Sequence, residues 1–144
     1  MTAADARARL AGARVAHLAT AAADGRPHIV PITFALLGDA TIVTAVDHKP
    51  KRTTALRRLA NIAENRWVAV LADHYDDDWA ELWWARADGS ARVVAPGEEP
   101  ALRAAAQRAL IDRYAPYRER PPAGPLVVIA VERWSGWSAR ALKD

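Results

Sequence analysis

The sequence contains no cysteine, and only three of its 20 basic residues are lysines. The absence of cysteine excludes disulfides, thiolate metal sites and a cysteine nucleophile. No apolar run approaches the roughly 20 residues that a membrane-spanning helix requires. Residues 1–20 also lack the charged-then-apolar order of a secretory signal. We therefore expect a soluble, cytoplasmic protein with no membrane partner.

The size and composition of the chain indicate one globular unit. Its 144 residues are close to the commonest domain size, and 51% of them are hydrophobic, which is enough for a real core. The sequence shows no internal repeat and no low-complexity tail. We therefore predict a single domain over residues 1–144.

Hydrophobic periodicity and turn residues predict an order of short elements. Thr2 and Asp5 form a capping-box pattern for a helix over 3–13. Pro31 cannot donate to a ladder, so its strand should lie at a sheet edge, at a bulge or beside open backbone. Asp88-Gly89 and Gly136 are interpreted as turns between strands. The predicted strands cover 15–21, 27–37, 40–46, 66–72, 79–87, 90–95 and a final pair within 126–139.

Two further helices are predicted, over about 52–64 and 98–115. On the first of them Leu59 and Ile62 belong to an apolar stripe, whereas Arg57, Arg58 and Asn61 fall on the other side. Six or seven strands joined mostly by hairpins, with two or three helices, predict an antiparallel barrel or sandwich capped by helices.

The most unusual feature is a basic stretch over residues 47–58. Five basic residues stand there against Asp47 alone, a local charge of +4. One interpretation is an ordinary solvated helix face. The other is an anion site, because a helix N-terminus offers free N–H donors and the positive end of the helix dipole. The glycines of a Walker or Rossmann phosphate loop are absent.

Other patterns give little chemistry. The acidic segment 73–81 fails as a calcium loop because Asp78 and Trp84 occupy the positions that require Gly and Glu. We interpret it as a polar hairpin loop and predict no metal. The serines lack a G-x-S-x-G setting. Any enzymatic chemistry should therefore come from a cofactor.

Six tryptophans accompany a single phenylalanine. Trp83 and Trp84 are adjacent in a predicted strand, so their side chains must face opposite sides of the sheet. One can fill the core, and the other then faces solvent, a flat ligand or a partner subunit. This pattern favours a dimer.

The order of these elements resembles the pyridoxamine 5′-phosphate oxidase-like superfamily. The resemblance is carried by "LAT–DGRPHIVPITFAL", "GDATIVTAVDHKPK" and "LRRLANIAENRWVAVLAD". It implies an FMN-binding split barrel, mostly β with α, that binds a flavin or deazaflavin and works as a homodimer. The segment from Lys49 to Val93 is similar to the actinobacterial branch that uses coenzyme F420.

The resemblance implies a set of cofactor-binding residues. Lys49, Lys51 and Arg52 match the basic loop that binds the cofactor phosphate. The strand from His28 to Thr33 matches the one that lines the flavin-like ring, and a partner protomer would supply an aromatic residue. The remaining candidates are Pro31, Thr44, Arg57, Arg58, Asn61, Trp83 and Trp84.

Charge and resemblance together favour one function. Coenzyme F420 carries a phosphodiester and an oligoglutamate tail, which suits the +4 stretch better than the single phosphate of FMN. We predict an F420-dependent oxidoreductase that transfers a hydride to a small unsaturated or conjugated acceptor, with a proton from water or Tyr75. An FMN-dependent oxidase or reductase, and a non-catalytic flavin, deazaflavin or haem carrier, stay open. The acidic segment argues against DNA binding.

Overall fold

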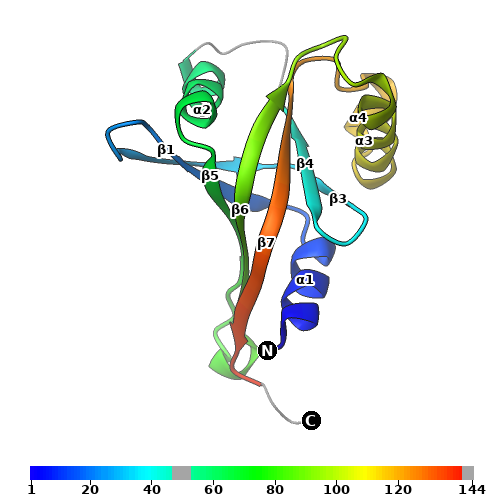
Figure 1. Cartoon of the computed structure of the whole chain (residues 1–144). Helices are drawn as coiled ribbons and strands as arrows, with labels where there is room; N and C mark the ends of the chain where they lie inside the picture. The colour runs from blue at the N-terminus through cyan, green and yellow to red at the C-terminus, as the bar shows by residue number, and fades with distance from the viewer. Residues whose placement is uncertain (47–52, 141–144) are drawn as a thin grey trace.

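A computed structural model of the chain describes residues 1–46 and 53–140. Within these ranges seven strands form one antiparallel sheet in the order β2-β1-β5-β6-β7-β4-β3 (Figure 1). The strands are β1 (Ala16–Ala21), β2 (Pro27–Ile32), β3 (Ala35–Leu37), β4 (Thr41–Ala45), β5 (Trp67–His74), β6 (Trp83–Val94) and β7 (Leu126–Ser138). The helices are α1 (Ala3–Gly12), α2 (Thr53–Glu64), η1 (Trp79–Glu81), α3 (Pro100–Arg113) and α4 (Pro116–Glu119).

The two edges of this sheet are consecutive in the chain. Only Thr33 and Phe34 separate β2 at one edge from β3 at the other. So short a link holds the edges close together, and the sheet must curl into the predicted split barrel. Pro31 lies in the edge strand β2, opposite His17 of β1. The predicted edge position is therefore confirmed, since a proline there removes no bond to a second neighbour.

The predicted strand over 27–37 is interrupted where it crosses between the edges. The N–H of Phe34 donates to the hydroxyl of Tyr114 at 3.2 Å instead of to a neighbouring strand. The Phe34 side chain is fully buried at this point. A long-range contact with a residue that follows α3 thus divides the strand.

The turns predicted at Asp88-Gly89 and at Gly136 are both wrong. Gly89 lies within the continuous strand β6, at a bulge in its pairing with β7, and Gly136 lies within the continuous strand β7. Each position needs glycine because of close packing. A Cβ on Gly89 would lie 2.1 Å from the carbonyl oxygen of Ala130, and one on Gly136 would lie 2.6 Å from that of Trp84.

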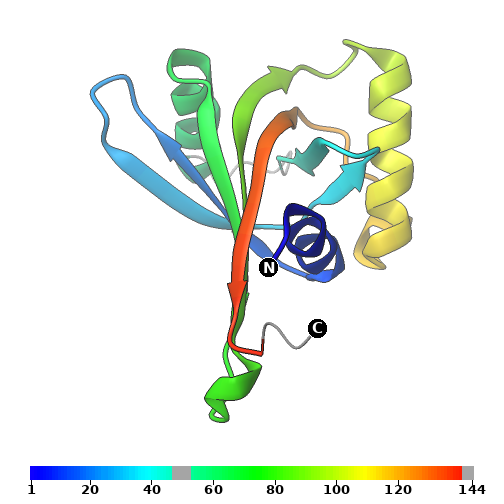
Figure 2. The same ribbon diagram turned by 60° about the horizontal axis from the view of Figure 1, so that its bottom comes forward.

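The helices cover different parts of the barrel. Figure 2 shows α3 beside β3 and β4, with α2 on the side of β1 and β5. Helix α1 begins with the predicted capping box between Thr2 and Asp5 and packs on β6 and β7. No helix in the described ranges is long and apolar enough to cross a membrane.

Two apolar clusters form the core of the part of the chain that the structure describes. The first joins Leu10 of α1 to the barrel interior, and the second joins Leu110 of α3 to β4, β6 and β7. Adjacent residues of β4, Ile42 and Val43, belong to different clusters and are both fully buried. Because α3 covers the outer face of β4 and β7, these strands carry apolar residues on both faces.

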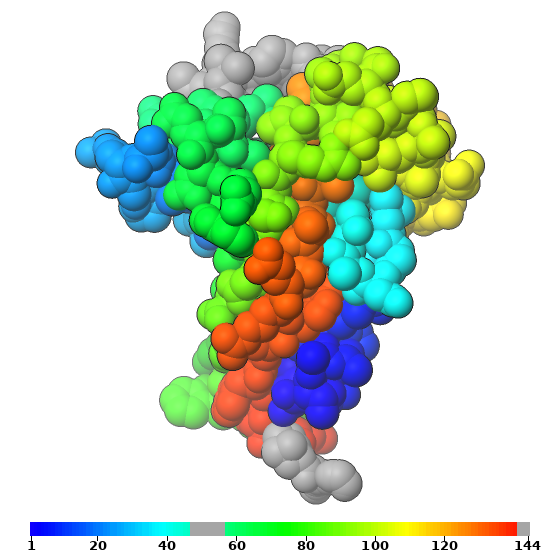
Figure 3. Space-filling view, in the orientation of Figure 1, coloured from blue at the N-terminus to red at the C-terminus, as the bar shows by residue number. Residues whose placement is uncertain are grey.

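Strands β5, β6 and β7 extend beyond the barrel. Figure 3 shows a broad upper part and a narrower stem, formed by the far ends of these strands with α1 against them. The stem carries the acidic segment and η1, and the barrel end carries α2, α3 and α4 (Figure 1). Any site near α2 is thus remote from the stem of the same chain.

Candidate functional site

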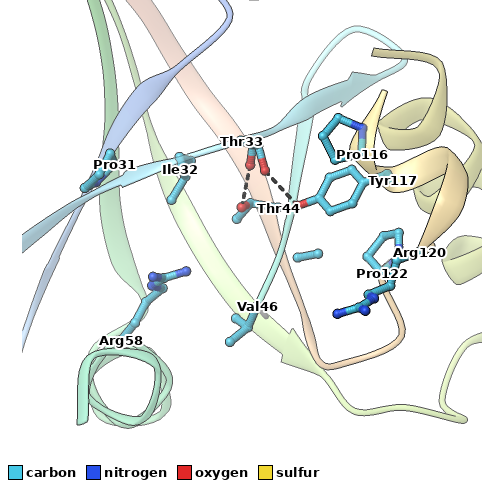
Figure 4. Close-up of a pocket in the computed structure, with 11 residues that line it drawn as sticks. Pro31, Ile32, Thr33, Thr44, Val46, Arg58, Pro116, Tyr117, Arg120 and Pro122 are labelled. Carbon is cyan, nitrogen blue, oxygen red and sulfur yellow. Dashed lines mark hydrogen bonds between the residues drawn. The ribbon is translucent and has the colours of Figure 1, made fainter. Parts of the chain in front are cut away.

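A cavity of about 340 Å³ opens between α2 and α4 at the barrel end (Figure 4). Its walls come from the crossing between β2 and β3, from the end of β4, from α2, and from α4 with the segment after it. The lining residues are Pro31, Ile32, Thr33, Thr44, Ala45, Val46, Arg58, Pro116, Tyr117, Arg120 and Pro122. The volume is in the range typical of small-molecule sites.

Hydroxyl groups form one wall of the cavity. The Thr44 hydroxyl donates to the carbonyl oxygen of Thr33 at 2.7 Å. The hydroxyls of Thr33 and Tyr117 lie 2.9 Å apart and share a hydrogen bond. This chain of contacts ties β4, the β2–β3 crossing and α4 together (Figure 4). It presents fixed polar groups that can bond to the edge of a ligand.

Arg58 of α2 forms the opposite wall. Its side chain is half-buried and points toward the cavity in Figure 4. Within the described part of the chain its buried Nε atom has no hydrogen-bond partner. Burial lowers the pKa of the Arg58 guanidinium, yet an arginine keeps its charge at any physiological pH. A half-buried cation facing a cavity is a good partner for an anion.

The other predicted residues of α2 lie elsewhere. Arg57 is exposed and does not line the cavity. Asn61 is 4% exposed, and its amide donates to the hydroxyl of Thr20 in β1 at 3.0 Å. The prediction that Asn61 lies on the outer side of the helix is wrong, because this bond to a buried threonine compensates for burial of the amide. Asn61 thereby fixes α2 against the barrel and positions Arg58.

Of the predicted β2 residues, Pro31 lines the cavity and His28 does not. His28 lies opposite Thr20 in the pairing of β1 with β2 and is half-buried. Its Nδ1 atom is buried without a partner among the described residues. Thr33 and Thr44, by contrast, both line the cavity as described above.

Trp83 and Trp84 lie on the stem. Trp83 is the first residue of β6. At the opposite end of β6, Val94 pairs with Leu126 of β7, and Leu126 also pairs with Ala45 of β4, which lines the cavity. An extended strand of this length spans roughly 36 Å, so neither tryptophan reaches the cavity of its own chain. Trp83 packs against the core cluster, with the Arg9 guanidinium 5.1 Å from its ring. A role for either at the site requires a second chain.

The three residues predicted to bind phosphate, Lys49, Lys51 and Arg52, lie outside the described residues. Their place in the chain is nonetheless informative. They connect Val46, which lines the cavity, to α2, which contributes Arg58. The phosphate role of this connection stays a prediction.

The acidic segment forms the polar loop that its sequence indicates. Asp78 caps η1, its carboxylate accepting from the N–H of Ala80 at 3.1 Å. Among the described residues no group of three potential ligands is arranged to hold a metal ion. Tyr75 is 66% exposed on the stem, so the cavity of its own chain is out of reach for this suggested proton donor.

Sequence reasoning missed Tyr117 and Arg120. Arg120 lies in the stretch 118–125, whose prolines and charges are typical of a surface linker, and Tyr117 lies between this stretch and the helix predicted over 98–115. Pairing between Thr33 and Tyr117, 84 residues apart, is a tertiary contact. The aromatic residue between two prolines was the available signal, but nothing in the sequence placed it beside β2.

Comparison with known proteins identifies the family. Residues 2–138 match the family described as pyridoxamine 5′-phosphate oxidase. The chain belongs to this family. A search of curated proteins finds no significant match.

Solved structures show the same fold at low sequence identity. A conserved hypothetical protein from Mycobacterium tuberculosis is 21% identical, with a TM-score of 0.75, over 100% of this chain and 90% of that one. The FAD binding protein from Mycobacterium smegmatis is 22% identical, with a TM-score of 0.65, over 95% and 94%. The heme storage protein from Vibrio cholerae is 16% identical, with a TM-score of 0.68, over 94% and 90%.

The cavity of this family member fits a flat cofactor with an anionic arm. Ile32 and Val46 supply apolar surface, and the threonine hydroxyls supply contacts for a ring edge. The guanidinium of Arg58, which lines the cavity, offers donors to a phosphate oxygen. The residues present thus suit a flavin or deazaflavin.

Proposed function

We propose that the protein is an oxidoreductase that uses coenzyme F420 and reduces a small unsaturated or conjugated acceptor. The observation that carries the proposal is Arg58, a half-buried cation at a cavity with a hydroxyl wall. Family membership supports a cofactor of the flavin class. The basic connection before α2 supports an extended polyanion such as F420, since the charge of +4 over 47–58 exceeds what one phosphate needs.

The chain's own residues orient and shield the reacting partners. When bound, the coenzyme supplies a hydride, and the acceptor gains that hydride together with a proton from water. Thr33 and Thr44 hold the ring edge by hydrogen bonds, and Arg58 fixes the anionic arm. Ile32, Val46 and Pro31 exclude water from the ring face.

FMN is the second candidate cofactor. The similar protein from Mycobacterium smegmatis is called an FAD binding protein, which favours an ordinary flavin. The two candidates separate in a titration of the apo protein with F420 and with FMN, followed by fluorescence. We expect a Kd for F420 in the micromolar range or below, about −8 kcal/mol or better, and FMN binding at least tenfold weaker. Equal or tighter binding of FMN contradicts the choice of F420.

A haem carrier is less well supported. The heme storage protein from Vibrio cholerae shares the fold. Among the described side chains that line the cavity, Tyr117 alone is of a type that commonly ligates haem iron, and its hydroxyl is already bonded to Thr33. Tight cofactor binding without turnover of any acceptor would favour a carrier.

We also propose that the protein is a homodimer in which Trp83 or Trp84 of one chain approaches the cavity of the other. The outer face of the sheet supports this, because Ile29 of β2 is 62% exposed and Trp67 of β5 is 51% exposed. Large apolar side chains on an open sheet face are typical of an interface. Sedimentation at micromolar concentration should report a dimer, and a monomer would contradict a shared site.

A further inference from the structure

A second guanidinium, that of Arg120, lies across the cavity from Arg58. Figure 4 shows the two side chains pointing inward from opposite sides, one from α2 and the other from the end of α4. In the described part of the chain neither forms an ion pair with another described residue. Two cations facing one cavity repel each other, and a bound anion on each side relieves that repulsion.

The wall that carries Arg120 is built from several anchored contacts. The backbone N–H of Arg120 donates to the carbonyl oxygen of Pro116 at 3.2 Å. Two side chains of α3 hold the segment that follows: Gln107 donates to the carbonyl oxygen of Pro122 at 2.7 Å, and Arg103 donates to that of Gly124 at 3.0 Å. The backbone beside Arg120 is thus fastened to α3, which is what a specific binding residue requires.

The position of Arg120 separates it from the predicted phosphate end. The basic connection leads into α2, on the Arg58 side of the cavity. If the anionic arm of the cofactor lies on the Arg58 side, Arg120 is available to bind a different anion. Tyr117 lies on the Arg120 side as well, with its hydroxyl hydrogen-bonded to that of Thr33.

We propose that Arg120 binds a carboxylate on the acceptor, so that the substrate class is a small conjugated carboxylic acid. The inference rests on the proposed function, because it assigns the Arg58 side to the cofactor. A guanidinium matches a carboxylate with two parallel hydrogen bonds. The apolar surface of Pro116 and Pro122 beside it suits the conjugated part of such a molecule.

The test compares benzoate with benzamide, two flat molecules of the same shape that differ in charge. Each is titrated by calorimetry into the apo protein and into the protein loaded with F420 or FMN. We expect benzoate to bind at least tenfold more tightly than benzamide. Arg120→Gln should remove this preference, and Arg120→Lys should restore part of it.

Arg118→Gln is the matched control. Arg118 lies on α4 two residues before Arg120, is likewise exposed, and donates to the carbonyl oxygen of Asp112 at 3.3 Å, outside the cavity. The preference for benzoate should survive this change. Loss of the preference in both variants would show a general charge effect and overturn the proposal, as would equal binding of benzoate and benzamide.

Cofactor affinity separates this inference from the proposed function. Arg120→Gln should bind F420 and FMN as the unaltered protein does, within about threefold. Normal cofactor binding with no preference for benzoate would overturn the carboxylate site alone. A preference for benzoate that depends on Arg120, in a protein that binds neither cofactor, would overturn the proposed function and support the carboxylate site.

Discussion

Replacing Arg58 by methionine should have opposite effects on folding and on cofactor binding. The methionine keeps an apolar stem of similar length but removes the charge and the buried Nε atom, which has no partner within the described ranges. A buried polar group without a partner costs roughly 1–3 kcal/mol. Because Arg58 is only half-buried, we expect the free energy of unfolding of the apo protein to rise by about 0.5–1 kcal/mol.

The same change should weaken cofactor binding. A hydrogen bond to a charged group contributes about 1.5–3 kcal/mol, which corresponds to a rise in Kd of roughly 10-fold to 150-fold. Urea denaturation of the apo protein gives the first quantity, and a fluorescence titration with F420 or FMN gives the second. Higher stability together with weaker cofactor binding identifies a binding residue, because replacing a residue that served only the fold would lower the free energy of unfolding.

Arg108→Met provides the control. Arg108 is exposed on α3 and does not line the cavity, so both quantities should stay within about 0.5 kcal/mol of the unaltered protein. The reasoning is refuted if Arg58→Met leaves cofactor affinity unchanged, or if it destabilises the apo protein by more than about 1 kcal/mol.

Two further predictions concern the scaffold of the site. Gly89→Ala should lower the free energy of unfolding by about 3 kcal/mol, because the new Cβ would meet the backbone of Ala130 at 2.1 Å. Gly12 lies in α1, where an added Cβ would have no atom within 4 Å, so Gly12→Ala should instead raise the free energy of unfolding by about 0.5–1 kcal/mol. Similar urea midpoints for Gly89→Ala and Gly12→Ala would contradict the close packing at the bulge. Asn61→Ala should destabilise by about 1–3 kcal/mol by leaving Thr20 without its donor, whereas the double change Asn61→Leu with Thr20→Val should cost much less. Equal losses in the single and double variants would argue against the bond between α2 and β1.

Much of the architecture followed from local patterns. The capping box of α1 depends on two side chains three residues apart, and such a pattern is complete in the sequence. Pro31 indicated an edge because a missing N–H has the same consequence in any sheet. The family resemblance, which the match over residues 2–138 confirms, added the split barrel that periodicity alone left open.

The errors occurred where distant contacts overrule local preference. Gly89 and Gly136 were taken for turns because glycine often marks one, yet here the neighbouring backbone leaves no room for a Cβ. Asn61 was expected on the solvent side of its helix because amide side chains prefer water. In the structure its amide is buried, because it donates a hydrogen bond to the hydroxyl of Thr20. None of these partners is a neighbour in sequence.

By itself the sequence determined the order of most helices and strands, the family and a basic stretch suited to an anionic cofactor, because capping, alternation and charge are local properties. The tertiary structure decided which cations face the cavity. Arg58 points into it and Arg57 does not, since adjacent helical residues are about 100° apart. Arg120 and Tyr117 joined the site because α3 and α4 pack beside the β2–β3 crossing, and no spacing along the chain encodes that contact.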